Sequence, residues 1–341
     1  MGDVALQTAT VNWLRALYGK ELRLSFLTSQ EFTSLLDSHP GIDQVISFNR
    51  RGGEEWKDLI AKIKHLDSEH PLDLIFDLHA TMRSFRLKLA FWRIPALTVD
   101  KRRWERFFLT KLKGVIFKRL ISPKLFGLET QVERIITDFD SLLGKGQGKW
   151  KTREYRSGPH GELTSLGELP VYALPLPYIV LAPSASFLYK RWPIESFVNL
   201  AKYLLEKTSH DLVILAGPED DFCKAFSEID SPRLHNLQGK TSLKESMSIL
   251  SRSIACIGND SGMNHIAEAY GVPCLTLFGP TDPRFGFAPH GESSHHISKE
   301  LWCKPCSTTG KTPCYRERHF CMEMITVEEV GAASLKILGE A

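Results

Sequence analysis

Apolar residues recur along this chain in two spacings, one typical of strands and one typical of helices. In the second half, short apolar runs end in polar turns, and helical patterns of apolar residues lie between them. The predicted strands cover residues 178–182, 211–216, 234–237, 254–257 and 275–278. The predicted helices cover residues 194–208, 220–229 and 242–250, and a fourth begins near His265. Strands that alternate with helices at this spacing predict βαβ units and a parallel sheet.

The first half of the chain shows the same alternation. Its predicted strands cover residues 22–27, 45–48, 72–78 and 97–99. Its predicted helices cover residues 4–18, 29–38, 54–65 and 83–91. Between the halves, residues 144–169 are rich in Gly, Ser, Lys and Pro and lack clear periodicity, which is typical of a connection. We therefore expect two Rossmann-like domains, residues 1–168 and residues 169–341.

The turn after the predicted strand 254–257 carries the strongest chemical signal. Its residues are Asn259, Asp260, Ser261, Gly262, Met263, Asn264 and His265. Backbone N–H groups at a helix N-terminus bind anions, and turns at the carboxyl ends of parallel strands form ligand crevices. Because a helical pattern follows Ser261 and Gly262 at once, the turn predicts a site for a phosphate-bearing ligand.

Three other polar turns are expected at the same edge of the sheet. They contain Ser184 and Ser186 with Lys190, Gly217 with Glu219, and Gly279 with Thr281 and Asp282. Lys190 can supply the cation that a nucleotide diphosphate needs, and Glu219 can accept from ribose hydroxyls. Taken singly, Lys190 can be a surface lysine, Asp260 a helix cap and His265 a packed helical residue. Their order at successive strand ends favours one shared nucleotide site.

Composition limits the class of protein. The 341 residues are 43% hydrophobic and 24% charged, which is typical of a globular chain. A net charge of +3 is no nucleic-acid signature, and we expect no such partner. No apolar run reaches about 18 residues, so we expect no membrane-spanning helix. Residues 101–120 hold eight Lys or Arg and one acidic residue among interleaved aromatics. This segment fits an anionic lipid or glycolipid, or equally a solvated helix face with a packed aromatic side.

Two further patterns resemble metal sites. Four of the seven cysteines lie near the end of the chain: Cys303, Cys306, Cys314 and Cys321. They could form a structural zinc site, although we favour packed free thiols. Asp138-Phe139-Asp140 matches the Asp-x-Asp pattern of metal-dependent glycosyltransferases. It lies in a helical pattern, where residues two apart do not face each other, so we expect no catalytic metal and no cofactor.

Together the motifs resemble glycosyltransferase family 9, the ADP-heptose:lipopolysaccharide heptosyltransferases. The matching segments are residues 2–4, 77–79, 83–84, 190–193, 217–219, 259–265 and 279–283. The resemblance spans nearly the whole chain, and Asn-Asp-Ser-Gly and Gly-Pro-Thr-Asp-Pro are its most specific parts. It implies an α/β GT-B fold, in which two Rossmann-like domains face each other across a cleft. The N-terminal domain would bind the acceptor and the C-terminal domain the nucleotide sugar, with a last helix that can pack back on the N-terminal domain.

The resemblance also implies roles for individual residues. The donor side would comprise Ser186, Lys190, Glu219, Asp260, Ser261, Gly262 and His265. The acceptor side would comprise His79, Arg83 and Ser84. Asp3 matches the aspartate taken as the general base, and a carboxylate near the attacking hydroxyl is the ordinary device for removing its proton. Lys190 and a helix N-terminus can stabilise the leaving ADP without a metal.

The beginning of the chain departs from the family pattern. Family members carry an apolar strand before the Gly-Asp turn, whereas this chain starts at Met1-Gly2-Asp3. We therefore expect an N-terminal sheet that lacks its first strand, and Asp3 on a frayed terminus. We also expect the native start to lie upstream of Met1.

The preferred hypothesis is an inverting transfer of heptose from ADP-heptose to the lipopolysaccharide inner core, either Kdo-lipid A or a heptosyl acceptor. The expected location is cytoplasmic, with contact to the inner-membrane surface. One alternative is a GT-B-like sugar-nucleotide 2-epimerase, which would share the nucleotide cleft but need no lipid-facing basic surface. Another is a non-catalytic nucleotide-sugar-binding protein.

Overall fold

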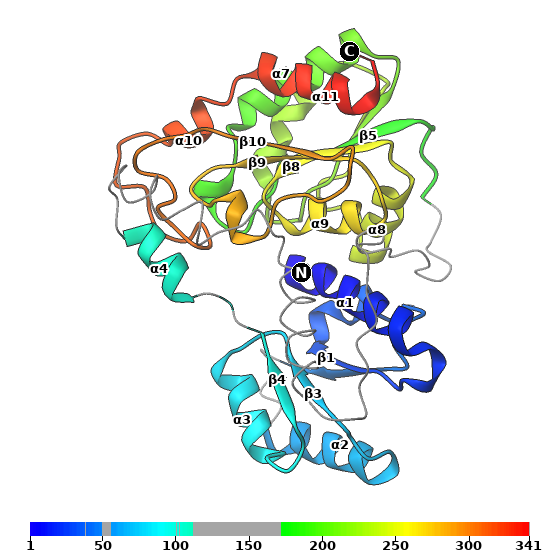
Figure 1. Ribbon diagram of the computed structural model, residues 1–341. Coiled ribbons are helices and arrows are strands. Elements are labelled where there is room, and N and C mark those ends of the chain that lie inside the picture. The colour runs from blue at the N-terminus through cyan, green and yellow to red at the C-terminus, as the bar shows by residue number, and fades with distance from the viewer. Residues whose placement is uncertain (38, 50–55, 100, 102, 112–171, 341) are drawn as a thin grey trace.

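The computed structural model describes two lobes (Figure 1). The described residues are 1–37, 39–49, 56–99, 101, 103–111 and 172–340. The predicted domain boundary and the Asp138-Phe139-Asp140 motif lie outside them. No helix among the described residues is both long and apolar enough to cross a membrane.

The C-terminal lobe is built on one six-stranded parallel sheet with the order β10-β9-β8-β5-β6-β7. Its strands are β5 (Tyr178–Ala182), β6 (Asp211–Ile214), β7 (Leu234–Asn236), β8 (Ala255–Asn259), β9 (Cys274–Phe278) and β10 (His295–Ser298). Every residue of β5, β8 and β9 is buried. Continuous apolar runs of this kind are what a parallel sheet covered on both faces requires, so the five strands expected here are confirmed.

Helices cover both faces of this sheet. They are α7 (Ile194–Lys207), α8 (Leu243–Arg252), α9 (Gly262–Ala269), α10 (Phe320–Glu323) and α11 (Val327–Leu338). Side chains alternate along β5: Val180 points into a cluster with residues of α8 and α9, whereas Ile179 and Leu181 point into a cluster with residues of α7 and α11. The last helix could have packed back on the N-terminal domain, but α11 packs on α7 and this sheet because Val330 and its apolar neighbours join that second cluster.

Three short 3-10 helices complete the lobe. They span Leu188–Lys190, Asp221–Glu228 and Pro283–Phe285. The α-helix expected at 220–229 is therefore a 3-10 helix, and the backbone bond from Cys223 to the carbonyl of Asp220 spans three residues. Periodicity over so few residues does not distinguish the two helix types.

The N-terminal lobe has smaller sheets. The parallel pair β1 (Ser25–Ser29) and β2 (Gln44–Phe48) is one sheet, and the parallel pair β3 (Ile75–Asp77) and β4 (Ala96–Thr98) is another. The helices are α1 (Gly2–Tyr18), α2 (Trp56–Glu69), α3 (Met82–Ala90) and α4 (Arg103–Lys111), with 3-10 helices at Gly19–Glu21 and Gln30–Leu35. The helix expected at 29–38 is thus a shorter 3-10 helix.

Helix α1 joins the lobes. It runs between the N-terminal strands and α9, as Figure 1 shows. Val4, Ala5 and Val11 share one apolar cluster with Val180 and Ile266 of the C-terminal lobe. Because this packing covers the first turn of α1, Asp3 lies half-buried beside α9 and not on the frayed terminus that we expected.

Candidate functional site

The strand order creates a crevice at the centre of the C-terminal sheet. From β5, the chain builds β6 and β7 on one side and β8, β9 and β10 on the other. Ligands of open parallel sheets bind where the strand order reverses in this way, beyond the carboxyl ends of the strands. Here that point lies between β5 and β8, so the turns after these two strands form the candidate site.

A buried ion pair spans this switch point. Lys190, which follows β5, places its Nζ 2.7 Å from Oδ2 of Asp260, which follows β8. The hydroxyl of Thr281, after β9, donates to the same oxygen at 2.9 Å. The Asp260 and Lys190 side chains are only 6% and 14% exposed. The structure therefore brings together residues from three predicted turns in one charged cluster.

Two asparagine contacts hold these turns at a fixed separation. The amide of Asn259 donates to the Pro183 carbonyl at 2.6 Å and its oxygen accepts from the backbone N–H of Trp192 at 2.9 Å. Gly258 lets the strands come this close, since a Cβ there would lie 2.6 Å from the carbonyl oxygen of Ala182. The crevice is thus held by buried, fully paired groups.

The N-terminus of α9 faces the crevice. Ser261 is the N-cap residue, yet its hydroxyl is buried and has no hydrogen-bond partner among the described residues. Unbonded backbone N–H groups of the first turn lie there as well. His265, one turn later, is buried, and burial lowers its pKa below the usual value, with the Lys190 charge acting in the same direction. The imidazole is therefore neutral at pH 7, and the helix end offers only uncharged donors beside the Lys190 ammonium.

The turn after β6 is organised by a residue that sequence reasoning missed. One oxygen of Asp220 accepts from the Ser184 hydroxyl at 2.6 Å and from the Gly217 N–H at 2.9 Å. Its other oxygen lies 3.3 Å from the Arg191 guanidinium. The predicted donor residues Glu219 and Ser186 are exposed on the turns after β6 and β5, on the same edge of the sheet. The sequence signal that could have identified Asp220 is its position three residues after Gly217 in a polar turn.

Lys190 is held from the other side by Gly310, a second residue that the sequence did not single out. Gly310 has a φ of +84°, and a Cβ there would lie 2.3 Å from Cγ of Lys190. The hydroxyl of Ser307 accepts from the N–H of Gly310 at 2.9 Å and so shapes this loop. The nearby Lys304 is buried and donates to the Phe278 carbonyl at 2.9 Å, and burial lowers its pKa to about 8.

The N-terminal lobe contributes Asp3 to the same region. A Cβ on the neighbouring Gly2 would lie 2.8 Å from Cδ2 of His265, so this turn of α1 lies directly against the donor-side histidine. The Asp3 charge raises the pKa of His79, Lys101 and His265, opposing the burial that lowers each of them. Asp3 therefore lies among groups from both lobes. Lys101 is a further residue that the sequence analysis did not assign to the site.

The predicted acceptor residues lie on and after a rigid turn. Asp77, at the end of β3, accepts from the N–H groups of His79 and Ala80 at 3.0 and 2.8 Å, and it pairs with Lys88 at 2.8 Å. Ala80 has a φ of +43°, which residues other than glycine rarely adopt and which this tight turn requires. Ser84 caps α3: its hydroxyl accepts from the Thr81 N–H at 2.8 Å. Arg83 is exposed in the first turn of α3.

Comparison with known proteins identifies the family. The family model of glycosyltransferase family 9 (heptosyltransferase) matches residues 122–315, more than half of the chain. The chain belongs to glycosyltransferase family 9. It is 30% identical over 300 residues to lipopolysaccharide heptosyltransferase 3 of Escherichia coli, covering 83% of this chain and 82% of that protein. It is 29% identical over 319 residues to lipopolysaccharide heptosyltransferase 1 of Pseudomonas aeruginosa, covering 90% and 83% of the two chains.

The solved structures agree on the fold of this family 9 enzyme. The structure of E. coli ADP-heptose lps heptosyltransferase II matches 99% of this chain and 96% of its own, with a TM-score of 0.66 at 21% identity. The predicted GT-B fold is therefore confirmed, and the family match confirms the assignment as a glycosyltransferase. The family match does not by itself assign a role to any single residue.

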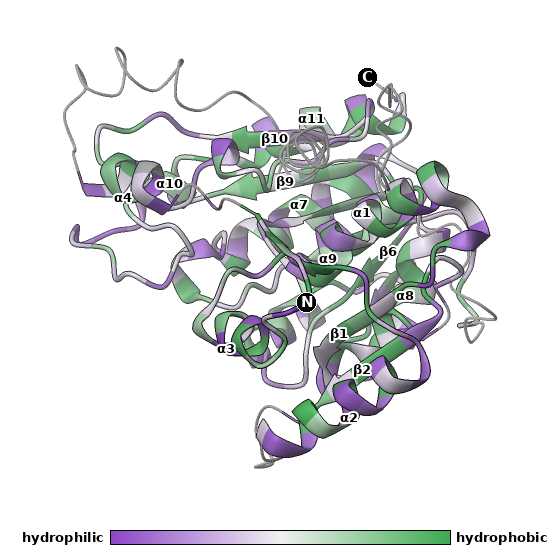
Figure 2. Ribbon diagram, turned by 60° about the horizontal axis from the view of Figure 1, so that its bottom comes forward, coloured by the Kyte–Doolittle hydropathy of each residue, from purple (hydrophilic) through white to green (hydrophobic). Residues whose placement is uncertain are grey.

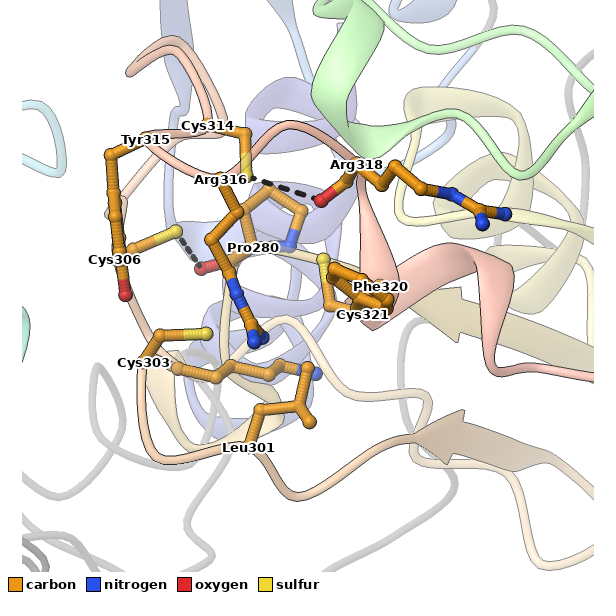
Figure 3. A pocket seen from close by; sticks show the side chains of 11 residues that line it. Pro280, Leu301, Cys303, Cys306, Cys314, Tyr315, Arg316, Arg318, Phe320 and Cys321 are labelled. Atoms are coloured by element: carbon orange, nitrogen blue, oxygen red, sulfur yellow. Dashed lines mark hydrogen bonds between the residues drawn. The ribbon is translucent and has the colours of Figure 1, made fainter.

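The four clustered cysteines of this family 9 chain line one pocket (Figure 3). Cys303, Cys306, Cys314 and Cys321 face it together with Lys304 and aromatic side chains. Burial raises the pKa of Cys321 to about 11, and the three neighbouring thiols act in the same direction. Within the part of the chain that the structure describes, no group of three or more His, Cys, Asp or Glu is arranged to hold a metal ion. None of the seven cysteines forms a disulfide bond.

Proposed function

We propose that this chain transfers heptose from ADP-heptose to the lipopolysaccharide inner core and inverts the anomeric centre in one step. The main support for the proposal is that predicted acceptor-side and donor-side groups lie near each other where the two lobes meet. Asp3 lies on one side, and the Lys190–Asp260 pair with the N-terminus of α9 lies on the other. The two relatives described above are lipopolysaccharide heptosyltransferases, and this is why we expect the transferred sugar to be heptose. The C-terminal lobe, residues 169–341, would hold the donor, and residues 1–168 would hold the acceptor.

Asp3 would act as the general base. An acceptor hydroxyl must lose its proton as it attacks the anomeric carbon, and a carboxylate within hydrogen-bond reach can take it. The charge of Asp3 acts on His79 and Lys101 of the acceptor lobe and on His265 of the donor lobe, raising the pKa of each against the effect of burial. A carboxylate at the junction of the two lobes would take the proton of the acceptor hydroxyl as the sugar is transferred to that oxygen.

The donor side would stabilise the leaving diphosphate. As the glycosidic bond breaks, negative charge builds up on ADP, and a fixed cation and free N–H donors lower the energy of that charge. Lys190 supplies the cation. The first turn of α9, with the unbonded Ser261 hydroxyl and Gly262, supplies the donors. Glu219 would hold the nucleoside side of ADP, and Ser186 is a further candidate for donor binding.

The acceptor side would bind an acidic, lipid-linked sugar. Arg83 is exposed on α3, and His79 lies on the turn that leads into it. An arginine pairs well with carboxylates such as that of Kdo. Because this acceptor is anchored in lipid, the enzyme would work at the cytoplasmic face of the inner membrane.

The test is turnover with purified protein, ADP-heptose and a Kdo-lipid A or heptosyl acceptor. We expect ADP release only when an acceptor is present, together with a product one heptose larger. Formation of a sugar-nucleotide epimer without acceptor would establish a 2-epimerase instead. Tight donor binding with no turnover on either acceptor would establish a binding protein.

The cysteine pocket is proposed to hold reduced thiols that pack the loop around Lys304. Titration of the unfolded protein should then find seven reactive thiols, and elemental analysis of the folded protein should find no stoichiometric metal. One zinc per chain that is lost on substitution of Cys303 would establish the structural metal site.

A further inference from the structure

Helix α3 exposes an apolar stripe to solvent. The stripe consists of Met82, Phe85, Leu89 and, just past the helix, Trp92. These residues are three or four apart and therefore share one helix face. Each leaves 50% to 73% of its surface exposed. The opposite face packs inward, where Leu87 and Phe91 contact residues of α2. The helix thus has a core-facing side and a second apolar side that no described residue covers.

Helix α4 adds a second exposed apolar face. Trp104, Phe107 and Phe108 are exposed and contact one another edge to face, with ring centroids 6.4 and 5.9 Å apart. The buried face of α4 packs on the C-terminal lobe through Leu109 and Phe285. The sequence left open whether the aromatic side of the basic segment is packed against the protein. In its described helix, residues 103–111, three aromatic side chains are exposed.

The two helices lie on one side of the molecule. The guanidinium of Arg103, in the first turn of α4, donates to the carbonyl of Ala80 in the turn before α3. Figure 1 shows both helices along the same edge, and Figure 2 shows hydrophobic and hydrophilic positions mixed around α3. We call the seven exposed apolar residues the docking surface: Met82, Phe85, Leu89, Trp92, Trp104, Phe107 and Phe108.

The charges around the docking surface are mostly positive. Residues 82–111 contain nine Lys or Arg and two acidic residues. Arg83 and Arg86 are exposed between the stripe residues, and Arg93 lies over the Trp92 ring at 5.3 Å. Exposed Trp, Phe and Leu bordered by Arg and Lys are typical of surfaces that insert into the interface of an anionic bilayer. Large exposed apolar patches on soluble chains mark interaction sites.

We propose that α3 and α4 dock this enzyme on an anionic lipid bilayer through the docking surface. The inference rests on the proposed function, because the acceptor proposed there is linked to a membrane lipid. The turn that carries His79 leads directly into α3. Docking would therefore hold the acceptor side of the site at the membrane, where the sugar of the acceptor emerges from the headgroup layer.

The first test measures binding to vesicles of phosphatidylcholine with and without phosphatidylglycerol. Wild type should cosediment with the anionic vesicles about tenfold more strongly than with the neutral ones. Leu89→Ser/Trp92→Ser and Arg86→Gln/Arg93→Gln should each lose about tenfold in binding. Lys202→Gln/Lys224→Gln and Met324→Ser are matched controls, because they change exposed residues of the C-terminal lobe. Equal vesicle binding by Leu89→Ser/Trp92→Ser and wild type would overturn the proposal.

The second test separates docking from catalysis. The Leu89→Ser/Trp92→Ser variant should transfer normally to a soluble, deacylated acceptor and lose about tenfold in rate on the same acceptor embedded in anionic vesicles. Equal rates for variant and wild type on both acceptors would overturn docking and leave the proposed function standing. Vesicle binding without transfer to either acceptor would contradict the proposed function and leave docking standing. Self-association of wild type that the variant abolishes would assign the surface to a second copy and overturn the lipid proposal.

Discussion

The two lobes contribute to the same site by different means. The C-terminal lobe places Lys190 and Asp260 at the ends of buried neighbouring strands in a six-stranded sheet. Among the described residues, the N-terminal lobe has two separate two-stranded sheets, and Asp3 comes from a helix that packs across onto α9. The donor side is therefore held by strand pairing, whereas the position of Asp3 depends on helix packing between lobes. The predictions below test this difference.

The largest expected effect is on the N-terminal side. Asp3→Asn keeps the shape of the side chain and removes its ability to accept a proton, so kcat should fall by about 10²–10⁴-fold. The KM for ADP-heptose should change little, because the donor is held by the other lobe. Steady-state kinetics measure both, with Glu21→Gln as an exposed control. An Asp3→Asn enzyme with wild-type kcat would remove Asp3 from catalysis.

The matching change on the C-terminal side should act on binding. Lys190→Ala removes the cation of the diphosphate site, and the affinity for ADP should fall by about 100-fold. The fold should survive because Asp260 keeps its hydrogen bond from Thr281. Calorimetric titration with ADP measures the effect. The control is Lys202→Ala, at an exposed position of α7. Unchanged affinity would exclude Lys190 from the site.

Acid should weaken the N-terminal lobe through His39. Burial lowers the pKa of His39 to about 4, with the Arg15 charge acting in the same direction, and its Nδ1 accepts from the Gly41 N–H at 3.1 Å. Since the unfolded chain takes up this proton near pH 6.5, stability is lost as pH falls from 6.5 towards 4, by about 2 kcal/mol between pH 7.5 and 5. His39→Gln should flatten this dependence in urea unfolding experiments. An unchanged slope would contradict the assignment.

A rise in pH towards 7 should weaken the C-terminal lobe through Glu268. Burial raises the pKa of this carboxyl to about 7, although it accepts from the Gly291 N–H at 2.9 Å. Because the unfolded chain releases this proton near pH 4.5, stability is lost as pH rises from 4.5 towards 7, by roughly 2 kcal/mol between pH 5 and 7. Glu268→Gln should remove this dependence and leave that of His39 unchanged. Hydrogen exchange should show the loss of stability at falling pH in residues 1–49 and the loss at rising pH in residues 255–298. The reverse pattern would contradict both assignments.

The smallest effect tests how the donor cation is positioned. Gly310→Ala should displace the Lys190 stem, because the added Cβ would lie 2.3 Å from its Cγ. The affinity for ADP should fall by about tenfold, which corresponds to about 1.4 kcal/mol. Gly271→Ala is the matched control: its φ is +75°, but nothing lies within 4 Å of the added Cβ. Equal losses in both variants would attribute the effect to backbone strain and not to Lys190.

Much of the C-terminal lobe was predictable from local pattern. Its strands are short, buried and apolar, and each ends in a polar turn, so their positions and the contribution of Lys190 and Asp260 to one edge follow from the sequence. Asp220 was not predicted, because its neighbour Glu219 has the same chemistry and only the turn decides which carboxylate faces inward. Gly310 could not be predicted, because it lies 120 residues from Lys190 in the chain.

The sequence by itself determined the βαβ order, the two Rossmann-like halves and the residue types at the strand ends, because these depend on periodicity and on local turn chemistry. The GT-B class was implied by the resemblance to family 9. Only the tertiary structure decided that the first turn of α1, at Gly2, lies against His265, that α11 stays with the C-terminal sheet, and that aromatic residues of α3 and α4 are exposed. These three outcomes depend on which of several apolar faces finds a partner. That choice is made by packing between segments far apart in the chain, and no local spacing records it.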